Sequence, residues 1–144
     1  MNVLFVCTGN TCRSPMAEAI FACRQTGSKH NVFSRGTSVF FEETINPKAK
    51  ITLEKMGISG FEHTSQQISE EDICSADLVL TMTSSHKMLL KSAFPKHNHK
   101  IFTLSEKAFG KDKAISDPYG QNEDVYLICA KEIEEAVVKL LEKI

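Results

Sequence analysis

The sequence predicts an α/β protein with a single domain, in which a four-stranded parallel sheet carries helices on both faces. Short runs of consecutive apolar residues alternate with longer amphipathic segments, which is typical of parallel strands connected by helices. The length of 144 residues suffices for one hydrophobic core. No internal repeat, low-complexity tract or linker divides the chain, so we expect one domain over residues 1–144.

Four short segments have the composition of buried strands. The first, residues 3–6, is apolar throughout, as expected for a central strand that is covered on both faces. Further strands are predicted at residues 31–34, 78–82 and 100–104. Ligands of parallel sheets bind beyond the carboxyl ends of the strands, where the strand order reverses. A site is therefore expected in the loop that follows the first strand.

The first and last helices are predicted from amphipathic spacing. A helix is predicted over residues 14–26, with Pro15 in its first turn, where a missing N–H has no cost. The apolar stripe on its inner side comprises Met16, Ala19, Ile20 and Cys23. Residues 105–119 are predicted to be a loop or irregular region. A long helix is expected over residues 122–144, with an apolar face of Val125, Ile128, Ile133, Val137, Leu140 and Leu141.

Capping residues predict the helices between these. Asn46 and Pro47 have the types expected at the cap and first turn of a helix that ends at Gly57. A serine and an aspartate at positions 69 and 72 have the spacing of a capping box for a short helix before Ala76. A further helix is expected over residues 84–93.

Composition restricts the partners and the location that we expect. The formal net charge of −1 gives no reason to expect binding to nucleic acid or to an anionic membrane. No apolar run approaches the roughly 20 residues that span a bilayer, and the first residues lack the basic region of a secretory signal. Five scattered cysteines form neither a disulfide framework nor a zinc motif, which favours a reducing cytoplasm. We expect a monomer without metal or cofactor.

The loop Cys7-Thr-Gly-Asn-Thr-Cys-Arg-Ser14 has the features of a phosphate-binding site. Because it follows a buried strand and opens a helix, its backbone N–H groups and the helix N-terminus converge on one point, which suits a tetrahedral dianion. Gly9 is expected to supply the unusual backbone angles, and Asn10 is the next best residue for them. Thr8, Thr11 and Cys12 complete the expected phosphate-binding loop.

The same loop makes Cys7 the candidate nucleophile. Backbone donors, the helix dipole and the Arg13 guanidinium would all stabilise its thiolate. Arg13 can hold two phosphoryl oxygens at once and leave the opposite side open for in-line attack. Ser14 is placed to donate a hydrogen bond to the sulfur.

The remaining cysteines have less distinctive surroundings. Cys23, Cys74 and Cys129 are interpreted as small core residues. Cys12 has two open interpretations: it fills space under the loop, or it captures oxidised Cys7 in a protective, reversible disulfide.

A thiolate mechanism also needs an acid for the leaving group and a base for water, and Asp117 is the best candidate. It precedes the last predicted helix, so it can lie at the same sheet edge as Cys7. Pro118 holds its backbone extended, and Tyr119 could flank the substrate. The alternative is an ordinary Asp-Pro turn that caps the final helix.

Residues 6–18, with the sequence Val-Cys-Thr-Gly-Asn-Thr-Cys-Arg-Ser-Pro-Met-Ala-Glu, and residues 117–119, Asp-Pro-Tyr, together resemble the low-molecular-weight protein tyrosine phosphatase family. The resemblance also covers residues 34–37 and 76–83, and nearly the whole chain follows the family's order of elements. It implies the low-molecular-weight phosphatase fold, phosphorylated protein substrates, and inorganic phosphate as product and inhibitor.

For single residues, the resemblance implies a phosphocysteine intermediate on Cys7, phosphate binding by Arg13 and the loop backbone, and Asp117 acting as acid and then base. It further implies that Asn10 maintains the shape of the loop and that Ser14 assists the thiolate. Phe40 stands where the family often places an aromatic wall of the substrate cleft; a role in anchoring its loop is the alternative.

Two positions depart from the pattern of tyrosine-directed members. Thr11 replaces a bulkier aliphatic residue and, with residues 82–87, resembles the bacterial protein-arginine-phosphatase branch. A hydroxyl there could hydrogen-bond a guanidinium, whereas an aliphatic wall favours an aryl ring, so phosphoarginine is preferred to phosphotyrosine as the expected substrate. Arg35 stands where alanine is more usual, and the sequence assigns it no role.

Two other classes of protein remain as alternatives. Arsenate reductases share the fold and the cysteine–arginine loop, but need additional cysteines to relay a disulfide, and no cysteine occurs from residue 75 to residue 128. A catalytically silent phosphoprotein-binding module would need neither Cys7 nor Asp117. The two histidines at positions 97 and 99 are interpreted as solvated rather than metal-binding.

Overall fold

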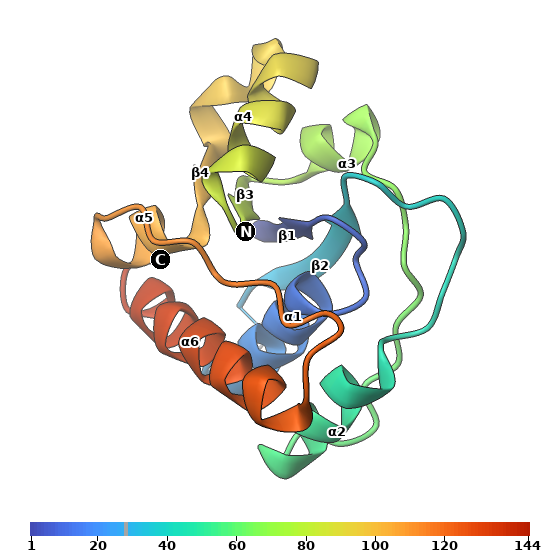
Figure 1. The fold of residues 1–144 in the computed structure, drawn as a ribbon. Helices are drawn as coiled ribbons and strands as arrows, with labels where there is room; N and C mark the ends of the chain where they lie inside the picture. The colour runs from blue at the N-terminus through green and yellow to red at the C-terminus, as the bar shows by residue number, and fades with distance from the viewer. Residues whose placement is uncertain (28) are drawn as a thin grey trace.

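The computed structural model describes residues 1–27 and 29–144 of the chain. In that part of the chain the sheet has four strands, all parallel, in the order β2-β1-β3-β4, which confirms the predicted fold class (Figure 1). The strands are β1 (Asn2–Cys7), β2 (Asn31–Gly36), β3 (Leu78–Thr81) and β4 (Ile101–Thr103).

The helices cover both faces of the sheet, as predicted (Figure 1). They are α1 (Arg13–Arg24), α2 (Pro47–Lys55), α3 (Glu70–Ser75), α4 (Ser84–Ala93), the 3-10 helix η1 (Pro95–Lys100), α5 (Leu104–Phe109) and α6 (Glu123–Leu141). Side chains of α1, α2, α5 and α6 share one hydrophobic cluster, and those of α3 and α4 share another. No helix in the described ranges is both long and apolar enough to cross a membrane.

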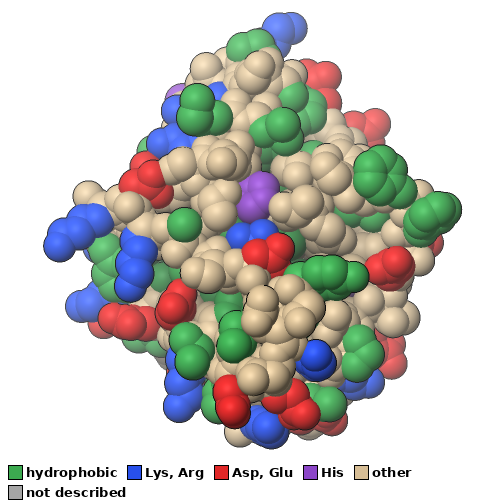
Figure 2. Space-filling model, in the orientation of Figure 1, with side chains coloured by type: hydrophobic (Ala, Val, Ile, Leu, Met, Phe, Trp, Pro, Cys, Tyr) green, Lys and Arg blue, Asp and Glu red, His purple; other side chains and the backbone are tan. Residues whose placement is uncertain are grey.

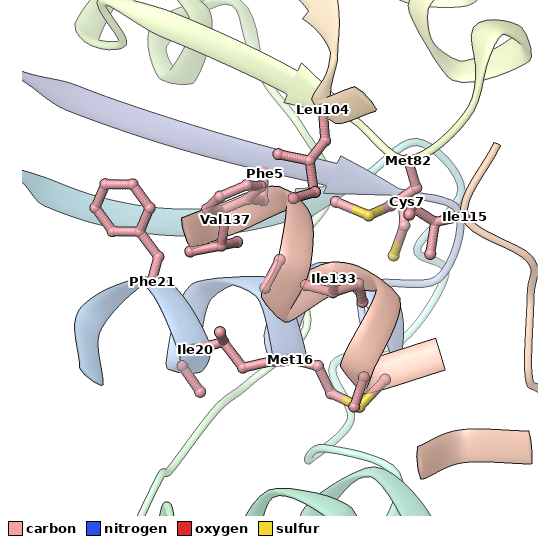
Figure 3. Close-up of a cluster of buried hydrophobic side chains, with 14 of the residues drawn as sticks. Phe5, Cys7, Met16, Ile20, Phe21, Met82, Leu104, Ile115, Ile133 and Val137 are labelled. Atoms are coloured by element: carbon pink, nitrogen blue, oxygen red, sulfur yellow. The ribbon is translucent and has the colours of Figure 1, made fainter. Parts of the chain in front are cut away.

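Alternation along β1 creates these two clusters, because successive side chains of a strand point to opposite faces. Val3, Phe5 and Cys7 join the cluster under α1 and α6, whereas Leu4 and Val6 join the cluster under α3 and α4. Figure 3 shows the first cluster, in which side chains from β1, α1 and α6 meet. The Phe5 and Phe21 rings pack edge to face, with centroids 5.9 Å apart. The core therefore fixes α1, and with it the loop that joins β1 to α1.

The strand order reverses at β1, which lies between β2 and β3. The chain leaves β1 for β2 on one side and later returns to β3 on the other side, so the loops after β1 and β3 border one crevice. This is the position that the sequence predicts for the site.

The prediction of an irregular region at residues 105–119 is wrong in its first part. Leu104 begins α5, which also shortens the predicted fourth strand to three residues. A capping box between Thr103 and Glu106 starts the helix, and Gly110, with φ of 74°, ends it. Residues 111–117 do lack regular structure.

Three predicted core positions are exposed instead. Cys23 is exposed to solvent because the buried side of α1 is formed by Ala17, Ile20 and Phe21. Ile128 is 59% exposed because α6 buries Tyr126, Cys129, Ala130 and Ile133, which are spaced along the opposite side. Cys74 lies on the outer side of the short α3, whose buried residue is Ile73. The prediction of a buried Cys129 is confirmed.

Candidate active site

The loop from Thr8 to Cys12 joins the C-terminal end of β1 to α1, and its conformation depends on Asn10. Asn10 has a φ of 55°, the left-handed region that few residues other than glycine adopt, and it is the one non-glycine residue with positive φ in the described part of the chain. Gly9, which was expected to supply these angles, is not among the residues with positive φ. The expectation for Gly9 was therefore wrong, and Asn10 makes the turn.

Asn10 is completely buried and bonds to Ser14 at the start of α1 and to two segments that are distant in sequence. Its Oδ1 accepts from the backbone N–H of Gln66 at 3.0 Å, and this orients the amide. Its Nδ2 then donates to Ser14 Oγ at 2.8 Å and to Ser34 Oγ at 3.0 Å. The carbonyl of Asn10 accepts from His63 Nε2 at 2.7 Å. Together these bonds hold the left-handed turn in place.

The Asn10 amide also determines the direction of the hydrogen bond at Cys7. Ser14 Oγ lies 2.9 Å from Cys7 Sγ and 3.5 Å from the carbonyl of Arg35. Because Ser14 Oγ accepts from Asn10 Nδ2, its own proton is free to donate, and the sulfur is the nearer acceptor. The geometry suits a thiolate that accepts a hydrogen bond from Ser14.

Further from the sulfur, the Ser34 hydroxyl donates to Glu18 Oε1 at 2.7 Å. Burial raises the pKa of Glu18, against the lowering effects of the Ser34 hydrogen bond and the Arg35 cation. Arg35 itself pairs with Asp72, with Nε 3.1 Å from Oδ2, and its guanidinium lies 5.2 Å from the Phe33 ring centroid. Arg35, which had no predicted role, thus connects β2 to α3.

Arg13 and Asp117 face each other across the mouth of the site. The Arg13 guanidinium is buried and donates from Nη1 to the carbonyl of Ile115 at 2.9 Å. Its Nη2 lies 3.6 Å from Asp117 Oδ2, and the Asp117 side chain is 54% exposed. Asp117 Oδ1 accepts from the backbone N–H of Tyr119, whereas Asn122 caps α6. The alternative in which Asp117 caps the final helix is therefore wrong.

A cavity of about 290 Å³ opens above this loop and brings together all the predicted site residues except Ser14, which does not line it. It is lined by residues 7–13, by Asp117, and by the aromatic residues Phe40, Phe41 and Tyr119. Phe40 is 87% exposed and Tyr119 69% exposed, so both rings stand at the entrance. Figure 2 shows acidic, basic and histidine side chains gathered near the middle of one face, with hydrophobic side chains around them.

His86 belongs to the segment 82–87 that resembles the protein-arginine-phosphatase branch, but its contact with the loop was not predicted from the sequence. Its Nε2 lies 2.8 Å from Thr8 Oγ1, and its Nδ1 lies 3.0 Å from Thr83 Oγ1 at the cap of α4. Burial, followed by the nearby Arg13 cation, lowers its pKa to about 4, while the Asp117 carboxylate acts in the opposite direction. A neutral imidazole therefore supports the first residue of the loop.

Cys12 lies below the loop as a free thiol. Its sulfur is 3.4 Å from the hydroxyl of Tyr126 and 3.8 Å from that of Thr11. Burial raises its pKa, against the lowering effect of these two hydrogen bonds. This environment favours the neutral thiol for Cys12.

The fold and this arrangement of cysteine, arginine and aspartate are those of a cysteine-based phosphatase. The chain matches the family described as Low molecular weight phosphotyrosine protein phosphatase over residues 2–144, and it belongs to that family. It is thus a hydrolase that acts on phosphorylated proteins.

Its relatives carry two different names. A protein-arginine-phosphatase of Bacillus subtilis is 39% identical, over 100% of this chain and 97% of the relative. The low molecular weight protein-tyrosine-phosphatase PtpB of Staphylococcus aureus is 38% identical, over 97% and 96%. A solved structure of YwlE arginine phosphatase, a C7S mutant with a phosphorylated active site serine, has a TM-score of 0.94 and 39% identity, with 99% and 95% covered. These names favour a phosphatase over an arsenate reductase or a silent binding module.

Proposed function

We propose that the protein is a protein-arginine phosphatase that works through a phosphocysteine intermediate on Cys7. Thr11 is the residue that selects the substrate, because it lines the same cavity as Cys7 and has a hydroxyl where an aliphatic side chain would favour an aryl ring. A phosphoarginine side chain offers N–H donors to that hydroxyl. The B. subtilis relative named protein-arginine-phosphatase supports this choice.

In the first step the Cys7 thiolate attacks phosphorus, the S–P bond forms, and the bond from phosphorus to the guanidino nitrogen breaks. Arg13 and the backbone N–H groups of residues 8–13 bind the phosphoryl oxygens. The bond from phosphorus to nitrogen breaks with its electron pair going to the guanidino nitrogen, and Asp117 gives its proton to that nitrogen, so the arginine side chain departs as a guanidinium. Ser14 stabilises the thiolate with its hydrogen bond.

In the second step Asp117, now a carboxylate, takes a proton from water while the oxygen attacks phosphorus. The S–P bond breaks and the electron pair returns to Cys7, so inorganic phosphate is the product. Free phosphate fits the same loop and acts as a competitive inhibitor. No metal or cofactor takes part in this scheme.

Phe40 and Tyr119 are proposed to line the entrance on either side of the substrate side chain. Cys12 is proposed to protect the nucleophile: after an oxidant converts Cys7 to the sulfenic acid, the Cys12 thiol condenses with it and releases water. A cytoplasmic location agrees with a reduced Cys7 nucleophile and with a reversible disulfide at Cys12, because thiols are regenerated there.

A protein-tyrosine phosphatase is the second candidate. The three aromatic side chains at the entrance can stack on a phenyl ring, and the S. aureus relative is named a tyrosine phosphatase.

The two candidates are separated by kcat/KM for a phosphoarginine peptide and a matched phosphotyrosine peptide. We expect the wild type to prefer phosphoarginine. Thr11→Val should reduce the ratio of kcat/KM for the phosphoarginine peptide to kcat/KM for the phosphotyrosine peptide by about tenfold or more. A hydrogen bond to a charged group contributes roughly 1.5–3 kcal/mol, and Val removes the hydroxyl that makes it. Thr11→Ser keeps the hydroxyl and should keep the preference. A wild-type preference for phosphotyrosine would reject the arginine assignment and leave the tyrosine phosphatase.

A further inference from the structure

A second cavity, of about 400 Å³, adjoins the cleft above Cys7. The two cavities share Thr11, Glu43 and Tyr119, so they form one continuous depression. Residues 44–47, which lead into α2, line the rest of the second cavity. A substrate protein continues on both sides of its phosphorylated residue, and a neighbouring side chain can therefore reach this second cavity.

The charge of the combined depression is negative outside the phosphate loop. Glu43 lines both cavities and Asp117 lines the first. Within the described ranges, Arg13 is the sole cationic residue lining either cavity, and its guanidinium is buried against the carbonyl of Ile115. Lys48, in the first turn of α2, donates from Nζ to the carbonyl of Gln121 at 2.6 Å, so its ammonium already has a partner.

The start of α2 offers little to an anion in this cavity. The Asn46 N–H donates to the carbonyl of Thr11 at 3.0 Å, and the Lys48 N–H donates to Asn46 Oδ1 at 2.9 Å. Pro47 between them has no N–H. The carboxylate of Glu43, by contrast, has no hydrogen-bond or ion-pair partner among the residues that the structure describes. The second cavity is therefore better suited to a cation.

The backbone at Glu43 is held firmly although its side chain is exposed. Its N–H donates to Ser65 Oγ at 2.8 Å, its carbonyl accepts from the Ser65 N–H at 2.8 Å, and the adjacent Thr44 forms an antiparallel bridge with Thr64. A charged side chain on a fixed backbone loses less conformational entropy on forming an ion pair than one on a mobile loop. The exposed ring of Tyr119 provides an aromatic wall, which also attracts cations.

We propose that this second cavity, formed by Thr11, Tyr119 and residues 43–47, is a subsite for a lysine or arginine side chain that neighbours the phosphorylated residue of the substrate. Glu43 is the counter-charge of the bound side chain and is a specificity-determining residue. The proposal rests on the phosphoprotein phosphatase function, and it applies equally to phosphoarginine and phosphotyrosine substrates.

The test compares phosphopeptides that differ in one residue directly before or directly after the phosphorylated one, with arginine in one peptide and glutamate in the other. We expect the wild type to favour the arginine peptide in kcat/KM by about three- to fivefold at one of these positions, the range of a partly exposed ion pair. Glu43→Gln should abolish this preference. Glu42→Gln is the matched control, because Glu42 is adjacent and equally charged but lines neither cavity.

A wild type without preference at either position, or an equal loss in both variants, would overturn the subsite. Binding of the same peptides to the Cys7→Ser protein, measured by calorimetry with and without Glu43→Gln, gives a second readout that needs no turnover. If no peptide releases phosphate above the Cys7→Ser background, the proposed function fails, and the binding data still decide whether Glu43 pairs with the neighbouring cation.

Discussion

His86 is expected to make folding sensitive to acid. The side chain is 8% exposed and bonds through both ring nitrogens to the hydroxyls of Thr8 and Thr83. Its pKa falls from 6.5 to about 4, because the ring is buried and Arg13 lies nearby. The unfolded chain therefore binds a proton at this position in a pH range where the folded chain does not, so the free energy of unfolding decreases as the pH falls.

The size of the effect follows from the two pKa values. Between pH 7 and pH 5 this single residue should lower the free energy of unfolding by about 2 kcal/mol. Burial lowers the pKa of His63 as well, which acts in the same direction. His63 remains in any His86 variant, so its contribution cancels when wild type and variant are compared.

Urea denaturation of the wild type and of His86→Gln at pH 7 and pH 5 measures this difference. From pH 7 to pH 5 the free energy of unfolding should decrease by about 2 kcal/mol more in the wild type than in the variant. His99→Gln, at an exposed position of η1, is the control and should keep the wild-type loss. An equal pH dependence in wild type and His86→Gln would refute a buried, neutral His86 behind the loop.

Two further substitutions probe the loop. Ser14→Ala should lower kcat by about ten- to a hundredfold, because it removes the donor 2.9 Å from Cys7 Sγ; unchanged steady-state kinetics would contradict that role. Gly36→Ala should destabilise the fold by about 1–3 kcal/mol, since a Cβ would lie 2.6 Å from the carbonyl oxygen of Thr8 and 2.6 Å from Val39 Cγ2. A urea denaturation curve identical to that of the wild type would contradict this steric clash.

Local patterns were sufficient to predict most of the fold. The apolar run at β1 and the caps at Asn46 and Ser69 depend on neighbours within a few residues, and all three elements form as predicted. α5 was missed although Thr103, Glu106 and Gly110 carry its capping signals, because a very short strand precedes it directly. The predicted face of α6 is confirmed at Ile133, Val137 and Leu140 and wrong at Ile128, which is exposed, while Tyr126, an amphipathic residue absent from the predicted face, is fully buried.

The site could be predicted only where it is contiguous in sequence. The loop from Cys7 to Ser14 is one segment, so its residue types reveal its chemistry. The supports of that loop come from elsewhere: His63 and Gln66 reach Asn10 from a connection 53 and 56 residues away, and His86 reaches Thr8 across 78 residues. Such contacts depend on the strand order, and nothing in the local sequence marks these side chains as neighbours of the loop.

The covalent step at Cys7 is tested most directly by trapping the phosphoryl group on the protein. The enzyme is mixed with a phosphoarginine or phosphotyrosine peptide, quenched within the first turnover, digested, and analysed by mass spectrometry. We predict one phosphoryl group on Cys7, loss of turnover in Cys7→Ala, and unchanged labelling of Cys7 in Cys12→Ala. A phosphoryl group on any other residue, or turnover that survives in Cys7→Ala, would contradict Cys7 as the nucleophile.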